Sequence, residues 1–149
     1  ELTKDALFEN VKLLNSNPNL DFIYSDEDKL EEDGTPCDPF FKPDWSPELF
    51  CTMMYTCHLG LYRRSIMQRI NGFRKGYEGS QDYDMVLRFV EVTAPERIAH
   101  IPKALYHWRK IYGSASESSQ YKTYAFDSAI ILVISMSLFS MPVVEAAAF

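Results

Sequence analysis

The sequence predicts an α/β fold in which a mixed sheet is flanked by helices. Apolar residues recur at helical spacing in the stretches 3–14 and 80–90, and short runs rich in aromatic and β-branched residues lie between and after them. Apolar residues make up 46% of the 149 positions, so the chain can bury a core. Its length fits one domain or part of one.

The first helix is expected over 3–14. Thr3 is a suitable N-cap, and Leu7, Val11 and Leu14 recur at the spacing of one helix face. The polar stretch that follows contains a proline, which ends the helix.

A short strand is expected over 21–25, and the polar stretch 31–36 contains an Asp-Gly pair typical of a reversal or an exposed loop. Residues 39–47 contain three prolines and no regular period. Long irregular loops in compact domains are often functional. Trp45 therefore either lines a ligand pocket or fills the core below the loop, and the sequence leaves both options open.

A further strand is expected over 57–62. Ser65 can cap a short helix that ends near residue 70. Two short strands, 98–101 and 104–108, are expected on either side of Pro102.

The stretch 78–88 reads as a loop that turns into a helix. Ser80 is a suitable N-cap, and acidic residues such as Asp82 are favoured in the first turn. Asp84 and Arg88 are four residues apart and can pair on the helix surface. The face expected to meet the core carries Tyr83, Val86, Leu87 and Val90. Asp82 lies outside that face, so it either caps the helix or meets something bound.

Three other segments complete a pattern with this helix. They are Tyr-Ser-Asp-Glu-Asp-Lys at 24–29, Pro-Phe-Phe-Lys-Pro-Asp-Trp-Ser-Pro at 39–47, and His-Ile-Pro followed by Leu-Tyr-His-Trp-Arg within 100–109. In this order they resemble the C-terminal half of a family 2 glycosyltransferase, of the branch that builds bacterial O-antigen and other surface polysaccharides. The resemblance covers residues 1–125 and implies part of a GT-A fold, with the acceptor-binding and catalytic-base portion in this chain.

The resemblance implies inverting transfer of a sugar from a nucleotide-sugar donor to a glycan or lipid-linked acceptor. Asp82 would be the general base, because a sugar hydroxyl is a poor nucleophile until a positioned carboxylate takes its proton. A divalent cation, Mn²⁺ or Mg²⁺, would stabilise the leaving diphosphate, and His107 would be a ligand of that metal. The other interpretation of His107 is a half-buried strand histidine between Tyr106 and Trp108.

Substrate contacts are implied for a wider set of residues. Tryptophans offer aromatic faces to sugar C–H groups, and guanidinium groups such as those of Arg88 and Arg109 bind phosphate oxygens. The predicted substrate-binding residues are Trp45, Gln81, Asp84, Arg88, Trp108, Arg109, Asp26 and Asp28. Asp26 and Asp28 also have the spacing of a metal motif, although closely spaced carboxylates are common in solvated turns.

In the family, an Asp-x-Asp metal motif lies just before a segment similar to residues 1–7. We therefore expect the main metal motif and the nucleotide-binding half to lie upstream of this chain. That expectation leaves an alternative, a non-catalytic module that binds a glycan or a partner protein. For the same reason, the isolated chain can be inactive even if it is part of a glycosyltransferase.

The net charge of −6 and the pI near 5.0 argue against a nucleic-acid-binding function. Cys37, Cys51 and Cys57 form no C-x-x-C pair and are expected to be reduced thiols. No signal-peptide pattern opens the sequence. We expect a cytoplasmic location, with peripheral contact to the inner face of the cell membrane as an alternative.

Residues 126–149 depart from the family pattern and are expected to form an apolar C-terminal helix. A membrane span needs about 20 apolar residues, and Pro142 and Glu145 interrupt this stretch. A buried or interfacial helix is therefore preferred to a membrane span, and a truncated end is a third interpretation.

Overall fold

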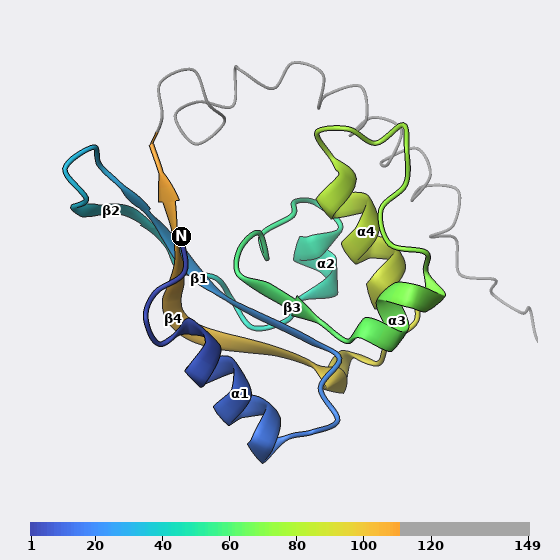
Figure 1. The fold of residues 1–149 in the computed structure, drawn as a ribbon. Coiled ribbons are helices and arrows are strands. Elements are labelled where there is room, and N and C mark those ends of the chain that lie inside the picture. Colours follow the sequence, from blue (N-terminus) through green and yellow to red (C-terminus); the bar gives the residue numbers. More distant parts are fainter. Residues whose placement is uncertain (111–149) are drawn as a thin grey trace, which may run out of the picture.

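The computed structural model describes residues 1–110, so the apolar helix expected over 126–149 lies outside the described residues. Helices and strands are interspersed along the chain, as Figure 1 shows. The elements are α1 (Ala6–Ser16), β1 (Phe22–Leu30), β2 (Pro36–Phe40), α2 (Pro47–Phe50), β3 (Gly60–Tyr62), α3 (Arg64–Arg69), α4 (Gln81–Val90), a short 3₁₀ helix η1 (Pro95–Arg97) and β4 (Ile98–Arg109).

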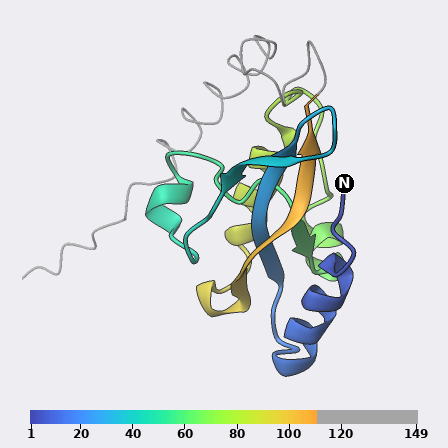
Figure 2. The ribbon, with the colours of Figure 1, turned by 90° about the vertical axis from the view of Figure 1, so that its left-hand side faces the viewer.

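The sheet is mixed and has β1 at its centre. Strand β4 runs parallel to β1 along one edge, from the pair Phe22–Ile98 to the pair Leu30–Arg109. The antiparallel strands β2 and β3 share the other edge of β1, β2 at its C-terminal half and β3 at its N-terminal half. This mixed sheet with flanking helices, visible from two sides in Figures 1 and 2, confirms the predicted α/β fold class.

The two faces of β1 build two separate cores, because successive side chains of a strand point to opposite sides. Phe22 and Tyr24 point toward α2, α3 and α4, and pack with Phe50 and Phe89. Ile23 points to the other side, where it packs with a cluster that includes Ala6 of α1. Helix α1 therefore covers one face of the sheet, and the remaining α-helices cover the other (Figure 1).

Two local predictions are wrong at the start of the chain. Helix α1 begins at Ala6 with Asp5 as its N-cap, and the Thr3 hydroxyl donates to the Asp5 carboxylate at 2.8 Å instead of capping the helix. The apolar residues Leu7 and Val11 are 63% and 53% exposed, so they do not face the core formed by the described residues.

Two strands are longer than the sequence suggested, whereas β3 covers Gly60–Tyr62, only the second half of the range 57–62 that was expected for it. Strand β1 continues to Leu30, which places Asp26 and Asp28 within a strand and not in a solvated turn. The two strands expected around Pro102 form one strand, β4. Ser25 pairs with Ile101 and Asp26 with Ala104, so the proline lies in a bulge where no ladder hydrogen bond is required of it.

The prediction that Ser65 caps a helix is wrong, because α3 already begins at Arg64 with Arg63 as its N-cap. Two further local predictions are confirmed. Strands β1 and β2 form the expected hairpin around the polar turn, and α4 begins directly after Ser80, although the Ser80 side chain makes no cap hydrogen bond. Within residues 1–110, no helix has the length and hydrophobicity required to cross a membrane.

Candidate functional site

Asp82 lies in the first turn of α4 and is partly buried. Its charge acts on the phenol of Tyr62 in β3, whose pKa is raised first by burial, then by Asp82 and then by Cys57. The Asp82 carboxylate is therefore within electrostatic reach of Tyr62 in β3.

Asp84 makes structural contacts inside the domain. Its side chain is 1% exposed and pairs with the guanidinium groups of Arg88, at 2.7 Å, and Arg74. Arg88 also donates to the carbonyls of Ile70 and Gly72 at 2.7 and 2.6 Å. The predicted pair of Asp84 and Arg88 is thus confirmed, and it ties the loop before α4 to the helix. A substrate-binding role for either residue stays a prediction that these contacts do not favour.

Asp26 is also occupied within the fold. Its Oδ1 accepts a hydrogen bond from the Lys42 backbone N–H at 2.8 Å and lies 2.8 Å from Nε2 of His100. The other ring nitrogen of His100 lies 3.3 Å from the exposed carboxylate of Asp44. Through these contacts the buried Asp26 carboxylate holds the loop before α2 in place against strand β4.

Lys42 is a buried cation, 5% exposed, that joins three segments. Its ammonium group lies 3.1 Å from the Glu27 carboxylate and donates to the carbonyls of Thr56, at 2.8 Å, and His58. The same Glu27 oxygen accepts the backbone N–H of His58 at 2.8 Å. Burial is the largest influence on Lys42 and lowers its pKa, although the Glu27 charge opposes that shift. The segment around Cys57 is therefore held against β1.

Asp28 and His107 are register partners on β1 and β4, and the Asp28 carboxylate is hydrogen-bonded to Nδ1 of His107. A carboxylate on one ring nitrogen fixes the orientation and tautomer of an imidazole, and this arrangement is common behind metal-binding histidines. Both predictions for His107 thus remain open, since it is a partly buried strand histidine with an oriented ring.

A cavity of about 400 Å³ lies beside this pair. Its lining combines aromatic rings, carboxylates, an ammonium group and a thiol. The residues are Glu27, Asp28, Lys29, Asp38, Phe40, Cys57 and Trp108. The Trp108 ring stacks on His58 with centroids 5.0 Å apart, and its indole N–H is buried without an acceptor within residues 1–110. A buried donor without a partner of this kind is uncommon in folded proteins.

The two tryptophans have different environments. Trp45 is partly buried and packs against the core, with its ring centroid 5.1 Å from that of Phe50 and 6.3 Å from that of Tyr55. Of the two options that the sequence left open for Trp45, these contacts favour core packing. Trp108 is the tryptophan that lines the cavity.

The remaining predicted residues lie elsewhere on the surface. The Gln81 side-chain oxygen accepts the Gly79 backbone N–H at 2.6 Å, which closes the loop before α4. Arg109 pairs with the carboxylate of Glu1 and is about half exposed. Neither Gln81 nor Arg109 is among the residues that line the cavity.

The structure therefore brings Asp28, His107 and Trp108 together at the cavity, whereas Asp82 lies at the start of α4 and does not line it. No sequence pattern identified Phe40 or Cys57 as residues that line the site. Their positions depend on pairing between distant strands, and ordinary aromatic and thiol residues carry no local signature of that pairing.

No group of three or more His, Cys, Asp or Glu side chains within residues 1–110 is arranged to hold a metal ion. Asp28 and His107 alone are too few for a metal centre, since bound cations generally take four or more ligands. The described residues do not by themselves fit the expected divalent cation.

No protein-family model matches the chain. Over 124 residues, 83% of the chain, it is 44% identical to the uncharacterized protein y4gI of Sinorhizobium fredii. Over 119 residues, 80% of the chain, it is 40% identical to the O-antigen biosynthesis protein RfbC of Myxococcus xanthus. The chain spans only 14% and 9% of the lengths of these two proteins. The fold and the comparisons thus define an α/β domain with similarity to parts of much longer bacterial proteins.

Proposed function

We propose that this chain is the acceptor-binding and catalytic-base part of an inverting glycosyltransferase that acts in surface polysaccharide biosynthesis. The observation that carries the proposal is the 40% identity, over 80% of the chain, to a protein named for O-antigen biosynthesis. The cavity beside Trp108 supports it, because aromatic faces with nearby carboxylates and N–H donors suit the apolar and hydroxyl groups of a sugar.

In the proposed reaction, the Asp82 carboxylate takes the proton of an acceptor hydroxyl. The hydroxyl oxygen then forms a bond to the anomeric carbon of the donor sugar, and the bond from that carbon to the diphosphate oxygen breaks. The products are a glycoside of inverted configuration, a nucleoside diphosphate and protonated Asp82. The position of Asp82 in the first turn of α4 is compatible with this role, since a positioned carboxylate can take the proton of a hydroxyl that lies beside it.

A divalent cation, when bound, would stabilise charge on the leaving diphosphate. Of the described residues, His107 could supply one ligand, and Asp28 would orient its imidazole through their hydrogen bond. The other ligands would have to come from outside residues 1–110.

The test is release of nucleoside diphosphate from a panel of nucleotide-sugars, measured with oligosaccharide acceptors and with the complete protein that contains this chain. Asp82→Asn should lower turnover by about 10²- to 10⁴-fold, while donor binding measured by calorimetry is retained. Glu32→Gln, which changes an exposed carboxylate of the β1–β2 turn, is the control and should leave turnover unchanged. Wild-type turnover in Asp82→Asn would show that Asp82 is not the base.

The alternative is a non-catalytic module that binds a glycan or a partner protein, and the observation that favours it is the cavity itself, which needs no reaction to bind a sugar. It predicts that methyl glycosides perturb the fluorescence of Trp108 and that Trp108→Ala abolishes binding, with no turnover under any condition. Phe41→Ala, at an apolar residue that is 72% exposed, is the control. Sugar transfer that depends on Asp82 would exclude this alternative.

A further inference from the structure

Lys42 is buried next to the cavity that contains Trp108, but it does not line that cavity. Its ammonium group has three N–H donors. It reaches three acceptors, which are the Glu27 carboxylate at 3.1 Å and the carbonyls of Thr56, at 2.8 Å, and His58. Burial of a cation is costly unless its charge and its donors are satisfied in this way. Because all three donors have a partner, Lys42 holds the main chain on both sides of the residue between the two carbonyls.

The residue held in this way is Cys57, which lines the cavity. Its φ of +33° lies in the left-handed region, which a residue with a side chain keeps only where its surroundings fix it. The carbonyls of Thr56 and His58 bind one ammonium group, and the His58 N–H donates to the Glu27 carboxylate at 2.8 Å. Lys42 and Glu27 thus form a clamp that places Cys57 in the wall of the cavity.

The clamp also determines where the aromatic wall of the cavity lies. The His58 ring stacks on Trp108, with centroids 5.0 Å apart, and its centroid lies 4.9 Å from that of Tyr106, two residues earlier on β4. The Lys42 ammonium also lies 5.7 Å from the ring centroid of Phe40, which lines the same cavity. Movement of the clamped segment would therefore take the His58 ring away from Trp108.

We propose that Lys42 is a positioning residue for ligand binding in this cavity. It sets the place of Cys57 and of the His58 ring, and through that ring it holds Trp108 as a fixed aromatic wall for a sugar. A wall that is fixed before the ligand arrives loses less conformational entropy on binding. The binding of a sugar rests on the proposed function, whereas the placement of His58 by Lys42 does not.

The variants for the test must separate this role from stability. Loss of the ammonium alone leaves the Glu27 carboxylate, which is 13% exposed, as an unpaired charge and can prevent folding. The main variant is therefore Lys42→Met/Glu27→Gln, in which neither charge remains. Its reference is Glu27→Gln, which keeps the ammonium and an oxygen that accepts the His58 N–H. Both are made in the 149-residue chain, and thermal melts give the temperature range in which each is folded.

NMR of the histidine rings measures the placement directly. The chain has three histidines, His58, His100 and His107, so few ring resonances have to be assigned. The ring current of the Trp108 indole shifts the protons of a ring that stacks on it. In the double variant the His58 resonances should move toward those of an unstacked histidine. In Glu27→Gln they should stay close to those of the wild type.

Affinity for a panel of methyl glycosides is the second measurement, followed through the indole N–H resonance of Trp108. The double variant should bind at least about tenfold more weakly than Glu27→Gln, which is the effect expected from the loss of one well-placed contact. Comparison of Glu27→Gln with the wild type gives the separate effect of the Glu27 charge, since that residue lines the cavity.

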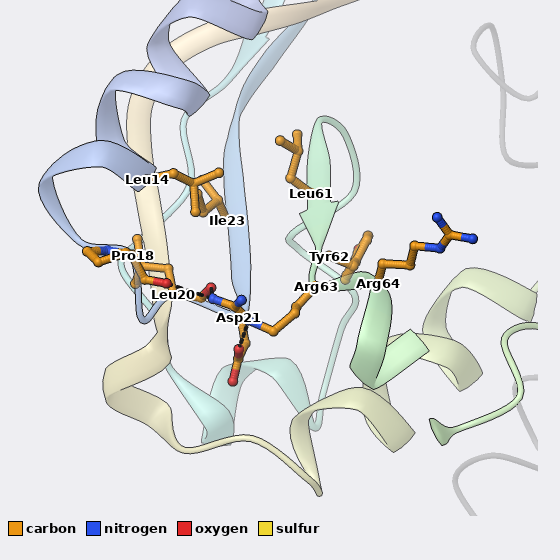
Figure 3. A pocket seen from close by; sticks show the side chains of 9 residues that line it. All are labelled: Leu14, Pro18, Leu20, Asp21, Ile23, Leu61, Tyr62, Arg63 and Arg64. Atoms are coloured by element: carbon orange, nitrogen blue, oxygen red, sulfur yellow. Dashed lines mark hydrogen bonds and ion pairs between the residues drawn. The ribbon is translucent and has the colours of Figure 1, made fainter. Parts of the chain in front are cut away.

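Another cavity of the domain, of about 390 Å³, provides the control for a general loss of stability. Figure 3 shows Leu14 of α1 and Ile23 of β1 on one side of it and Leu61 of β3 on the other. Leu14→Ala enlarges this cavity and should lower the thermal melt. It should leave the His58 resonances and the glycoside affinity unchanged, because no residue of the clamp lines this cavity.

Two results would overturn the proposal. His58 resonances that coincide in the double variant and in Glu27→Gln would show that the ammonium does not place the ring. Displaced His58 resonances with unchanged glycoside affinity would show that binding does not depend on this placement. If no glycoside binds to the wild type, the proposed sugar binding fails by itself, and the His58 resonances still decide whether Lys42 places the ring.

Discussion

The carboxylate of Asp28 and Nδ1 of His107 are hydrogen-bonded across the parallel pair of β1 and β4. If Nδ1 carries the proton in this bond, Nε2 carries the lone pair that a metal ion or a substrate proton would meet. The pair lies at the cavity that also contains Trp108, so the orientation of one imidazole ring depends on a carboxylate that the sequence places 79 residues earlier.

The first prediction concerns metal dependence in a preparation with sugar-transfer activity. His107→Ala should raise the metal concentration required for half-maximal turnover. Asp28→Asn should raise it by about 10- to 100-fold, because partners that orient a ligand contribute that much to metal affinity. The measurement is turnover against Mn²⁺ or Mg²⁺ concentration. A metal titration unchanged in both variants would exclude His107 as a ligand.

The fold class and the helix at Asp82 could be predicted from local patterns, but the full length of β1 could not. Asp26 and Asp28 resemble turn residues in sequence, yet they lie within a buried strand. Burial of these carboxylates is stabilised by His100 and His107, which reach them from β4. Pairing over such a distance in sequence leaves no local pattern.

In helix α1, too, a local pattern predicted the element but not its neighbours. Its spacing of apolar residues predicted a helix correctly, but the stripe that contains Leu7 and Val11 is largely exposed, and Ala6 and Asn10 are the buried residues. Periodicity shows which residues share a face and does not show what covers that face. For Trp45 and Trp108, likewise, only the strand pairing decides which of the two lies at the cavity.

The second prediction concerns the buried carboxylate of Asp84. Asp84→Asn should lower the free energy of unfolding at pH 7 by about 3 kcal/mol, because two guanidinium groups then face a neutral amide. This value is at the low end for a buried ion pair, because Arg74 is about half exposed. Urea denaturation measures the loss, and Glu32→Gln is the control. A loss below about 1 kcal/mol would show that the network contributes little to stability.

The third prediction concerns how the stabilisation by the Asp84 carboxylate depends on pH. Burial alone would raise the pKa of Asp84, but the hydrogen bonds from Arg74 and Arg88 outweigh it and lower the pKa. The pKa of Asp84 in the folded protein is therefore below its value of about 3.9 in the unfolded chain. The stabilisation is fully present above the unfolded-state pKa, and it is lost as the pH falls through the folded-state pKa. The difference in unfolding free energy between wild type and Asp84→Asn should be constant from pH 7 to about pH 5 and shrink below about pH 4. A difference that grows on acidification would contradict this assignment.

The fourth prediction concerns the buried ammonium of Lys42. Lys42→Met should destabilise the fold by about 3 kcal/mol at pH 7, since the Glu27 carboxylate then has no cation beside it. Burial lowers the pKa of Lys42, so between the folded-state pKa and the unfolded value of about 10.4 the unfolded chain binds more protons. Stability of the wild type relative to the variant should therefore rise as the pH increases from 8 to 10. The control is Lys12→Met, at a lysine whose side chain is 66% exposed, and it should show no such trend. If the stability difference between wild type and Lys42→Met also stayed constant with pH, the pKa of Lys42 would not be lowered in the folded protein.

The last prediction concerns the close approach of Tyr62 to Gly60. A Cβ atom at residue 60 would lie 2.6 Å from the Tyr62 hydroxyl oxygen and 2.9 Å from the ring carbon that bears it. Gly60→Ala should therefore displace the ring from its stacked position on Phe22, where the centroids are 4.6 Å apart, and lower the free energy of unfolding by about 1–3 kcal/mol.

A double variant distinguishes this steric effect from a general effect of alanine in β3. Tyr62→Phe removes the oxygen that makes the shortest contact, so the double variant Gly60→Ala/Tyr62→Phe should lose less stability than the sum of its single variants. The remaining ring carbons, at 2.9 and 3.0 Å from the added Cβ, allow only partial recovery. Additive losses in the urea denaturation of the three variants would show that Tyr62 does not lie over Gly60.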